Sequence, residues 1–298
     1  MDICNVIQLE KTKIVNISEN IFVKLENFNI SGSIKDRIVW WILNKAKKEG
    51  KLLPNQSIIE ASSGNTGISL ATYGHYFKHK VYVVLEKNVT PERKEIIEFL
   101  GGNVLYADSD LFLDAIKLRD KFANENNCFI LNQFDSQDCI DCHYHTTGKE
   151  IIEQIPQVDI FILGAGTGGC IMGVSKRLKE YNPNIKIILV DSSQTHKMYD
   201  MFYNINNPID NQKHNIQGYS KDATKYLLNL KWIDDVILVS DKEALEHAKY
   251  LSSHFNMHVG ITSGANYYVA KQFIHTNKNI VTIFCDHGDR YVSLYEIV

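Results

Sequence analysis

Four short segments rich in Gly, Ser, Thr and Asn are the places where this sequence could do chemistry. They are SGSIKDR (31–37), ASSGNTG (61–67), GAGTGG (164–169) and GITSGAN (260–266). The N–H groups of such turns bind anionic groups, and their hydroxyl and amide side chains orient small polar ligands. Each turn is predicted to follow a strand, the position where open α/β sheets bind ligands. Four of them in one chain predict a single site assembled from several loops.

Lys35, within the first turn, is a candidate nucleophile. It stands between small residues and Asp36-Arg37, just before a long helical pattern. A lysine amine attacks aldehydes when burial or a nearby positive charge lowers its pKa. The alternative is a surface lysine that forms an ion pair with Asp36 at the start of a helix. Lys35 taken alone does not decide between the two.

The GAGTGG turn predicts a bound phosphate. Gly164, Gly166 and Gly169 satisfy the spacing G-x-G-x-x-G between a strand pattern and a helix pattern, and the next strand ends at Asp191. A dinucleotide-binding βαβ unit has this arrangement. The N–H groups at the start of a helix would receive the phosphate of another cofactor equally well. The turn therefore leaves the identity of the phosphate open.

Cys139, Cys142 and His143 match the C-x-x-C-H attachment signal of c-type haem. Haem attachment requires export, and the N-terminal residues MDICNVIQLEKTK have no apolar segment of a signal peptide. No second C-x-x-C pair and no H-E-x-x-H spacing is present to build a metal site. We therefore expect no metal, interpret the match as chance and leave a redox role of Cys139 and Cys142 open. The six cysteines are expected to be reduced.

Strand and helix patterns alternate along nearly the whole chain. The strand patterns lie at 21–26, 57–61, 81–86, 103–108, 159–164, 185–191, 234–240 and 281–286. The helix patterns lie at 38–48, 66–77, 91–101, 170–181 and 241–255. This alternation predicts an α/β protein whose parallel sheets are covered by helices on both faces. The polar segment 195–221 is expected on the surface, and the irregular segment 135–145 is expected to be a domain junction.

The composition is ordinary for a globular protein. The chain has 298 residues, a net charge of -3, 44% hydrophobic and 22% charged residues. The net charge gives no electrostatic reason to expect nucleic acid or a membrane surface as a partner. No apolar run approaches the length of a membrane span, so we expect a cytoplasmic protein.

Together and in this order, the four turns resemble those of the cysteine synthase / cystathionine β-synthase family of pyridoxal-phosphate (PLP) enzymes. The match runs from about Ile21 to Tyr291, and its strongest part is KLENFNISGSIKDRI. That segment resembles the lysine segment of the family, which implies a Schiff base between Lys35 and the cofactor. A dinucleotide enzyme has no use for the lysine turn and the ASSGNTG loop, so the resemblance favours PLP over NAD.

The resemblance also implies roles for the other turns. ASSGNTG resembles the loop that receives the substrate carboxylate, and Asn65 in it would also reach the 3′-oxygen of the cofactor. GAGTGG resembles the phosphate cup, and Thr262 in GITSGAN would face the pyridine nitrogen. The implied substrate-binding residues are Ser62, Ser63, Gly64, Asn65, Thr66, Gln133 and Gly218. The implied cofactor-binding residues are Lys35, Asn65, Gly166, Thr167, Gly168, Gly169, Cys170 and Thr262. Weaker matches lie at Phe134, His143-Tyr144, Thr146 to Gly148, Gln217, Asp286 and Gly288 to Tyr291.

The implied fold is that of the tryptophan synthase β subunit, with two lobes and PLP in the cleft between them. Each lobe would hold a mostly parallel twisted sheet covered by helices. The smaller, mobile substrate-loop domain would span 36–140, and the larger PLP-phosphate domain would span 1–35 and 141–298. The resemblance also implies a homodimer.

The implied chemistry is β-elimination or β-replacement on a small L-amino acid. A hydroxyl at the pyridine nitrogen leaves that nitrogen unprotonated and the ring a moderate electron sink, which suits β-elimination. Lys35 would remove the α-proton, and loss of the Cβ substituent would give an aminoacrylate, to which a thiol, sulfide or water then adds. Our leading hypothesis is a cysteine synthase that converts O-acetyl-L-serine and sulfide to L-cysteine and acetate. The alternatives are a cysteine-consuming lyase that produces hydrogen sulfide, a cystathionine- or lanthionine-type β-synthase, a 2,3-diaminopropionate-type synthase, an NAD-dependent oxidoreductase and an inactive regulatory homologue.

Three departures from the family pattern bear on the substrate. NVIQL stands near the N-terminus where the family has Thr-Pro-Leu, and Cys170 stands where the phosphate cup usually has Thr. After Gln217 the family usually has Gly-Ile-Gly, whereas this chain has GYSKDATKYL. Asp222 in that segment is a candidate catalytic acid or base, or a solvated loop carboxylate.

Overall fold

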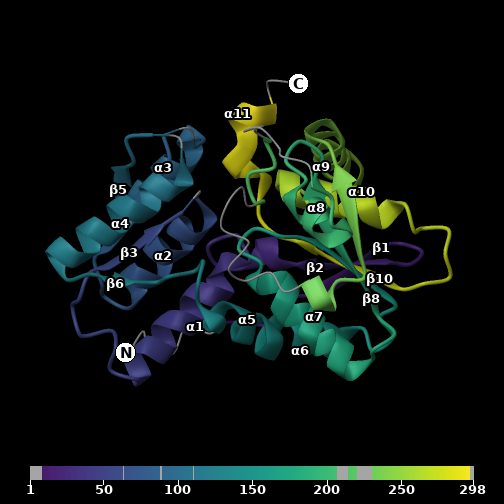
Figure 1. The fold of residues 1–298 in the computed structure, drawn as a ribbon, viewed down its shortest axis with the longest axis horizontal. Coiled ribbons are helices and arrows are strands. Elements are labelled where there is room, and N and C mark those ends of the chain that lie inside the picture. The colour runs from purple at the N-terminus through teal and green to yellow at the C-terminus, as the bar shows by residue number, and fades with distance from the viewer. Residues whose placement is uncertain are drawn as a thin grey trace.

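Two separate β-sheets organise the protein (Figure 1). The computed structural model describes residues 9–62, 64–87, 89–109, 111–206, 214–219 and 230–295. No helix in these residues is both long enough and apolar enough to cross a membrane.

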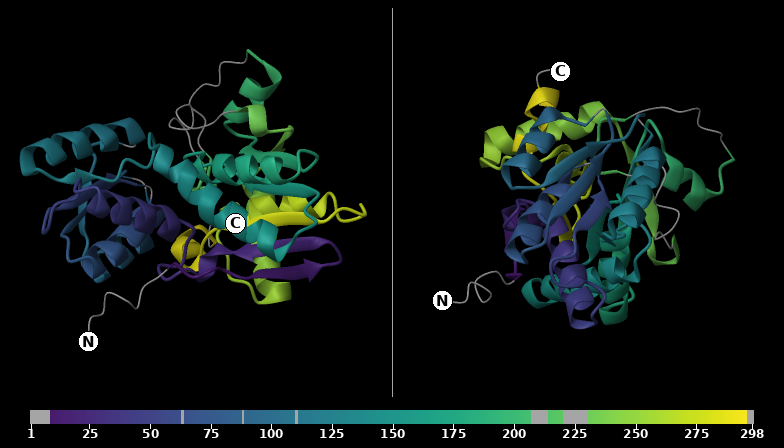
Figure 2. Two further views of the ribbon diagram at one scale, coloured as in Figure 1. Left: turned by 90° about the horizontal axis from the view of Figure 1, so that it is seen from below. Right: turned by 90° about the vertical axis from the view of Figure 1, so that its left-hand side faces the viewer.

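The larger sheet has six strands. In spatial order they are β1 (Ile14–Ser18), β2 (Ile21–Leu25), β10 (Ile280–Phe284), β7 (Ile160–Gly164), β8 (Lys186–Ser192) and β9 (Asp235–Val239). All neighbours are parallel except the β1–β2 hairpin at one edge. The early strand β2 lies beside the late strand β10, as the purple and yellow ribbons show in Figures 1 and 2.

The smaller sheet has four parallel strands. In spatial order they are β5 (Asn103–Tyr106), β4 (Val81–Leu85), β3 (Ile58–Ala61) and β6 (Phe129–Ile130). These strands all fall inside the predicted smaller domain, 36–140, although the boundaries themselves stay a prediction.

Helices cover both faces of each sheet. They are α1 (Lys35–Lys48), α2 (Asn65–Tyr76), α3 (Pro91–Phe99), α4 (Phe112–Asn126), α5 (Gln137–His143), α6 (Lys149–Gln154), α7 (Gly169–Tyr181), α8 (Lys197–Tyr203), α9 (Asp241–Phe255), α10 (Ile261–Lys271) and α11 (Val292–Tyr295). Short turns of 3₁₀-helix lie at η2 (Glu26–Phe28), η5 (Leu230–Trp232) and η6 (Gly288–Tyr291), and a π-helical turn lies at η3 (Tyr144–Gly148). The larger sheet has α9 and α10 on one face and α7 on the other.

Alternate residues of the larger sheet enter different cores, as the pleat requires. Ile160 and Ile162 pack in the cluster that includes α10, whereas Phe161 and Leu163 pack in the cluster that includes α7. The smaller sheet divides its side chains in the same way between two further clusters. The predicted α/β fold with two helix-covered, mostly parallel sheets is confirmed.

Two local predictions were wrong. The segment 135–145 looked irregular, but residues 137–145 are helical, because Ser136 caps α5 and Cys139 and Cys142, spaced by one helical turn, both point into the core. The domain junction expected in this segment stays a prediction. The GITSGAN turn does not follow a strand: Val259 forms only an isolated bridge with His287, and the motif makes up the first turns of α10. In the polar segment 195–221, α8 is helical, and 207–213 and 220–221 lie outside the described residues.

Candidate active site

A pocket lies where the loops at the carboxyl ends of the larger sheet meet the starts of α1, α2, α7 and α10. The predicted site residues that line it are Lys35, Asn65, Gly166, Thr167, Gly168, Cys170, Gly218 and Thr262. Gly169 follows as the first residue of α7. The lining residues that were not predicted include three with polar side chains, namely Tyr219, Asn266 and Cys285. All four turns and Gly218 thus converge on one pocket, although they lie far apart in the chain.

The start of α7 forms a cradle of backbone atoms. Gly168 has a φ of 87°, a conformation that favours glycine, and a Cβ at Gly166 would lie 2.5 Å from the carbonyl oxygen of Gly218. The first N–H groups of a helix have no carbonyl partner within the helix. Because α7 is 13 residues long and its dipole adds to these donors, the cradle suits an anionic phosphate.

Lys35 is the first residue of α1 and is half-buried in the pocket wall. Its N–H donates to Ser33 Oγ at 3.3 Å, and its amine has no hydrogen-bond or ion-pair partner among the described residues. Asp36 does not pair with it. The buried Asp36 carboxylate instead accepts hydrogen bonds from Ser31 and, at 2.6 Å, from Ser69 Oγ, and burial raises its pKa. The alternative of a surface ion pair between Lys35 and Asp36 is therefore not what the structure contains.

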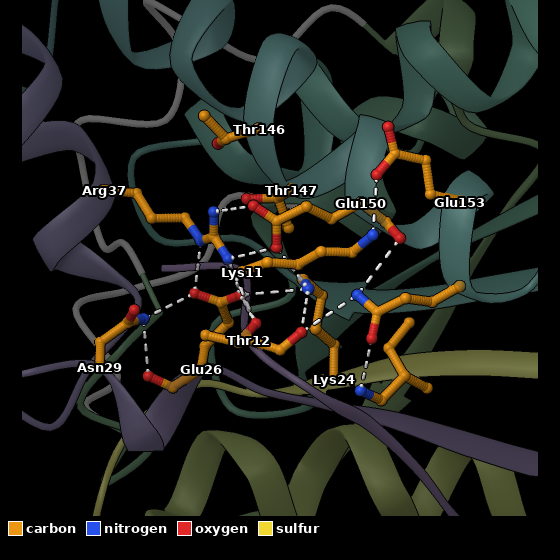
Figure 3. Close-up of polar contacts among 12 residues, drawn as sticks. Lys11, Thr12, Lys24, Glu26, Asn29, Arg37, Thr146, Thr147, Glu150 and Glu153 are labelled. Atoms are coloured by element: carbon orange, nitrogen blue, oxygen red, sulfur yellow. Dashed lines mark hydrogen bonds and ion pairs between the residues drawn. The ribbon is translucent and has the colours of Figure 1, made fainter. Parts of the chain in front are cut away.

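A buried ion cluster anchors the first turn of α1 (Figure 3). The Arg37 guanidinium donates to Glu26 at 2.6 and 2.8 Å and to Glu150 at 2.7 and 2.8 Å. Lys24 Nζ lies 2.7 Å from Glu150, so two cations face two carboxylates. Burial alone would raise the pKa of Glu26, but the Arg37 guanidinium overrides it and lowers this pKa to about 2. Since Lys35 precedes Arg37 by two residues, the cluster fixes the backbone that carries the candidate nucleophile.

The ASSGNTG loop is held largely by its own side chains. Ser62 Oγ accepts from the N–H groups of Gly64 and Gly67 at 3.0 and 3.1 Å. Thr66 Oγ1 donates to Gln133 Oε1 at 2.6 Å, which brings together two of the predicted substrate-binding residues. Ser62, Gly64, Thr66 and Gln133 are buried beside the pocket and do not line it. Ser63 lies outside the described residues.

Asn65 connects this loop to the segment after β10. Its Nδ2 donates to Asp286 Oδ2 at 2.6 Å, and its Oδ1 accepts from Arg290 Nη1 at 2.6 Å. Arg290 also donates to the carbonyl of Ser31 in the lysine turn, and Tyr291 donates to Asp286. The Asn65 amide keeps one N–H and one lone pair for a ligand. One arginine thus links the lysine turn to the ASSGNTG loop.

Thr262 lies at the start of α10 and its hydroxyl interacts with the thiol of Cys285. Burial raises the pKa of Cys285 to about 12 and also raises that of Cys170, so both thiols stay neutral. Cys170 therefore brings no negative charge to the phosphate cradle. Nothing in the local sequence marked Cys285 as a pocket residue, because the strand pattern 281–286 that includes it reads as ordinary core.

The C-x-x-C-H residues belong to the protein core. Cys139, Cys142 and His143 are buried on α5, and burial raises the pKa of Cys139 to about 12 and lowers that of His143 to about 3. Within the described ranges, no group of three or more His, Cys, Asp or Glu side chains is placed to hold a metal ion.

Asp191 does not offer the free carboxylate that a dinucleotide ribose requires. Its Oδ2 accepts from the N–H groups of Met198 and Tyr199 at 2.9 and 3.1 Å, and its Oδ1 accepts from Ser192 N–H at 2.9 Å. Asp191 therefore fixes the start of α8. A dinucleotide site needs a free carboxylate here to bind the ribose, so the structure does not support the dinucleotide interpretation of the GAGTGG turn.

The pocket fits PLP by its donors. A glycine cradle at a helix start suits the phosphate, and the unpaired Lys35 amine suits the aldehyde. The hydroxyl of Tyr219 is buried in the pocket wall and has no partner in the part of the chain that the structure describes. Asp222 lies outside the described residues, so its place relative to the pocket stays a prediction.

Comparisons with known proteins agree with this fit. The model of the pyridoxal-phosphate dependent enzyme family matches residues 6–286. Cysteine synthase B of Campylobacter jejuni is 33% identical over 92% of this chain and 90% of its own. The crystal structure of cysteine synthase from Entamoeba histolytica superposes with a TM-score of 0.87 at 29% identity, over 97% of this chain and 89% of the other.

A hydrogen sulfide-producing enzyme from Fusobacterium nucleatum is also similar. Its TM-score is 0.84 at 31% identity, over 94% of this chain and 96% of the other. Both kinds of relative share the fold and the length of this chain. The chain therefore belongs to the family of pyridoxal-phosphate-dependent enzymes and is an enzyme of the cysteine synthase type.

Proposed function

We propose that this enzyme makes L-cysteine from O-acetyl-L-serine and sulfide, with acetate as the leaving group. The observation that carries the proposal is the Lys35 amine, which faces the pocket without an ion-pair partner among the described residues. The similarity to cysteine synthases supports this choice of substrates.

PLP bound in the pocket would supply an electron sink for the negative charge that develops at the substrate Cα. In this proposal Lys35 Nζ removes the Cα proton, because a neutral amine released beside the substrate is a competent base. The cradle at Gly166 to Gly169, with Cys170, holds the phosphate, and Thr262 Oγ1 faces the pyridine nitrogen. A hydroxyl there can donate without transferring a proton, which keeps the sink moderate.

The ASSGNTG loop would bind the substrate carboxylate through Ser62, Ser63, Gly64, Asn65 and Thr66, with Gln133 and Gly218 completing the substrate site. Since Thr66 already donates to Gln133 and Ser62 already accepts from Gly64, the loop is ordered by its own hydrogen bonds. A preformed loop loses less conformational entropy when the substrate binds. The domain 36–140 would close over the substrate, and the protein would form a homodimer, which light scattering on the purified protein tests.

A second candidate is the release of hydrogen sulfide from cysteine. The similarity to the hydrogen sulfide-producing enzyme of Fusobacterium nucleatum favours it. Asp222 would then activate the incoming water or thiol. Both candidates begin with the same removal of the Cα proton, so they differ only in the group that leaves Cβ.

Separate incubation with O-acetylserine, O-phosphoserine, serine and cysteine tests the proposal. We expect acetate release from O-acetylserine, and cysteine formation when sulfide is added, to be faster than sulfide release from cysteine. The reverse order would replace the proposal by the second candidate. No turnover of any of the four would contradict both.

Lys35→Ala tests the role of Lys35. We expect it to abolish the absorbance of lysine-bound cofactor near the visible edge of the ultraviolet and to lower turnover by at least ~10²-fold, as loss of general base catalysis does. Lys48→Ala is the matched control, because Lys48 is an exposed residue of the same helix. If the absorbance survives in Lys35→Ala, another lysine holds the cofactor.

A further inference from the structure

Tyr219 carries a buried hydroxyl that has no hydrogen-bond partner among the residues that the structure describes. The residue is 8% exposed and packs in the core beneath the larger sheet. Burial raises its pKa well above the usual value, so the phenol remains protonated. It is therefore a hydrogen-bond donor that has no acceptor within the described ranges.

The Tyr219 hydroxyl lies against Gly164 at the end of β7, two residues before the phosphate cradle, and Tyr219 and the cradle line the same pocket. A Cβ at Gly164, the first residue of the GAGTGG turn, would lie 2.3 Å from the Tyr219 hydroxyl oxygen and 2.0 Å from the ring. The preceding residue, Gly218, contacts both Gly166 and Thr262. Tyr219 thus occupies the space that a side chain at position 164 would take, in the wall of the same pocket.

The other polar side chains near this position each have at least one partner among the described residues. Thr167 Oγ1 accepts from Gly169 N–H at 3.4 Å, and the Thr262 hydroxyl interacts with Cys285. Asn266 accepts from Gly164 N–H at 2.9 Å and donates to the Ile283 carbonyl at 3.0 Å. Among the described residues of this wall, the Tyr219 hydroxyl differs from those of Thr167 and Thr262 in having no hydrogen-bond partner.

A buried hydroxyl without an acceptor destabilises the protein, and a bound acceptor removes that penalty. We propose that Tyr219 is a phosphate-binding residue, whose hydroxyl donates to a phosphate oxygen of bound PLP. It would add a side-chain donor to the backbone N–H groups of the cradle, where Cys170 supplies only a weak thiol donor. The proposal rests on the cofactor site described above.

The test compares Lys35→Ala with Lys35→Ala/Tyr219→Phe, so that only non-covalent binding is measured. Equilibrium dialysis with PLP and with pyridoxal, which lacks the phosphate, gives the two affinities. We expect Tyr219→Phe to weaken PLP binding by about 10- to 100-fold, the range for a hydrogen bond to a charged group, and to leave pyridoxal binding unchanged. Unchanged PLP binding would overturn the inference, and so would an equal loss for PLP and pyridoxal.

The thermal stability of the cofactor-free proteins gives a second readout. Tyr219→Phe removes an unpaired buried hydroxyl, so its melting temperature should equal or exceed that of the parent. A clearly lower value would mean that the hydroxyl has a partner in the protein and would also overturn the inference. Tyr267→Phe is the matched control, since Tyr267 is buried in the same core and does not line the pocket.

The failure of the cofactor site would look different. If neither protein bound PLP at all, the site assignment and this inference would both fall. If both bound PLP with equal affinity, only the role of Tyr219 would fall.

Discussion

Replacing Arg37 by leucine should destabilise the protein strongly, because it unbalances the buried ion cluster in Figure 3. In the native protein Lys24 and Arg37 face Glu26 and Glu150, and the four formal charges cancel. Arg37 and Glu26 are both fully buried. After Arg37→Leu, two carboxylates share the single Lys24 ammonium, and five N–H donors are lost from their surroundings.

The expected cost is about 3–5 kcal/mol, the usual range when one partner of a buried ion pair is removed. That is a large share of the ~5–15 kcal/mol by which folded domains are stable. The cost is mostly the penalty of a carboxylate left buried without its cation. It should therefore fall when the carboxylate is neutralised.

Arg37→Leu/Glu26→Gln makes that correction, because the remaining Lys24 and Glu150 form a balanced pair at 2.7 Å. We expect the double variant to be more stable than Arg37→Leu by about 2 kcal/mol, as coupled neighbouring sites allow. Urea unfolding followed by circular dichroism measures all three proteins. Lys45→Leu is the control, since the Lys45–Asp138 pair is partly exposed and should contribute less than about 1 kcal/mol.

The pH dependence of stability tests the same account of the ion cluster independently. Arg37 lowers the pKa of Glu26 to about 2, so Glu26 stabilises the native protein above about pH 4.5 and this contribution is lost as the pH falls toward 2. Without Arg37, burial raises this pKa, and Glu26 takes up a proton at higher pH. The stability gap between the variant and the native protein should narrow as the pH falls below 7. Two results would refute this account of the ion cluster. One is a loss of stability in Arg37→Leu no larger than that in Lys45→Leu, and the other is a double variant less stable than Arg37→Leu.

Two further predictions concern His143 and Gly64. Burial lowers the pKa of His143 to about 3, so the unfolded chain takes up a proton first and stability should fall below about pH 6.5 by up to ~1.4 kcal/mol per pH unit. Between pH 7.5 and 5, the free energy of unfolding of His143→Gln, measured by urea titration, should fall by ~2 kcal/mol less than that of the native protein. An equal fall in both proteins would contradict the conclusion that His143 is buried in its neutral form. Gly64→Ala should raise the KM for the amino-acid substrate and lower stability, because Gly64 has a φ of 142° and a Cβ there would lie 2.3 Å from Arg93 Cδ. Gly101→Ala, with a φ of 83° and no neighbour within 4 Å, should carry only the backbone strain of ~1 kcal/mol, and equal effects of the two variants would contradict the steric argument.

Sequence patterns predicted the parts of the fold that depend on local periodicity. The GAGTGG turn does join β7 to α7, because a long apolar strand and a long amphipathic helix leave little choice at their junction. The lysine turn was likewise expected before a helix, although α1 begins at Lys35 itself and not at Ile38. The residues alone did not decide whether the cofactor is PLP or NAD. The family resemblance favoured PLP.

The predictions that were wrong depended on contacts distant in the chain. GITSGAN was expected after a strand, but Val259 and His287 form an isolated bridge there and not a strand. The segment 135–145 looked irregular because its apolar stripe is made of cysteines, whose burial the local pattern does not signal. Helix α4 has small alanines on its buried face and was not predicted for the same reason.

The pocket shows the same limit. Tyr219 and Cys285 enter it only through the way β7, β10 and α10 are placed, and neither stands in a recognisable motif. The contacts of Asn65 with Asp286 and Arg290 join residues at opposite ends of the chain. No local sequence pattern could have predicted these contacts.

The pairing of β2 with β10 also sets an order on folding. All strands of the smaller sheet come from residues 58–130, so this sheet can form once that stretch of chain has been synthesised. In the larger sheet, Ile21 must wait for Ile280, and until then β2 exposes an apolar edge that can pair with other chains. Closing such a long loop is slow, and domains of this kind tend to fold in the order in which they are completed. Lys35, the proposed catalytic lysine, follows β2 by ten residues, so the site would be assembled among the last steps of folding.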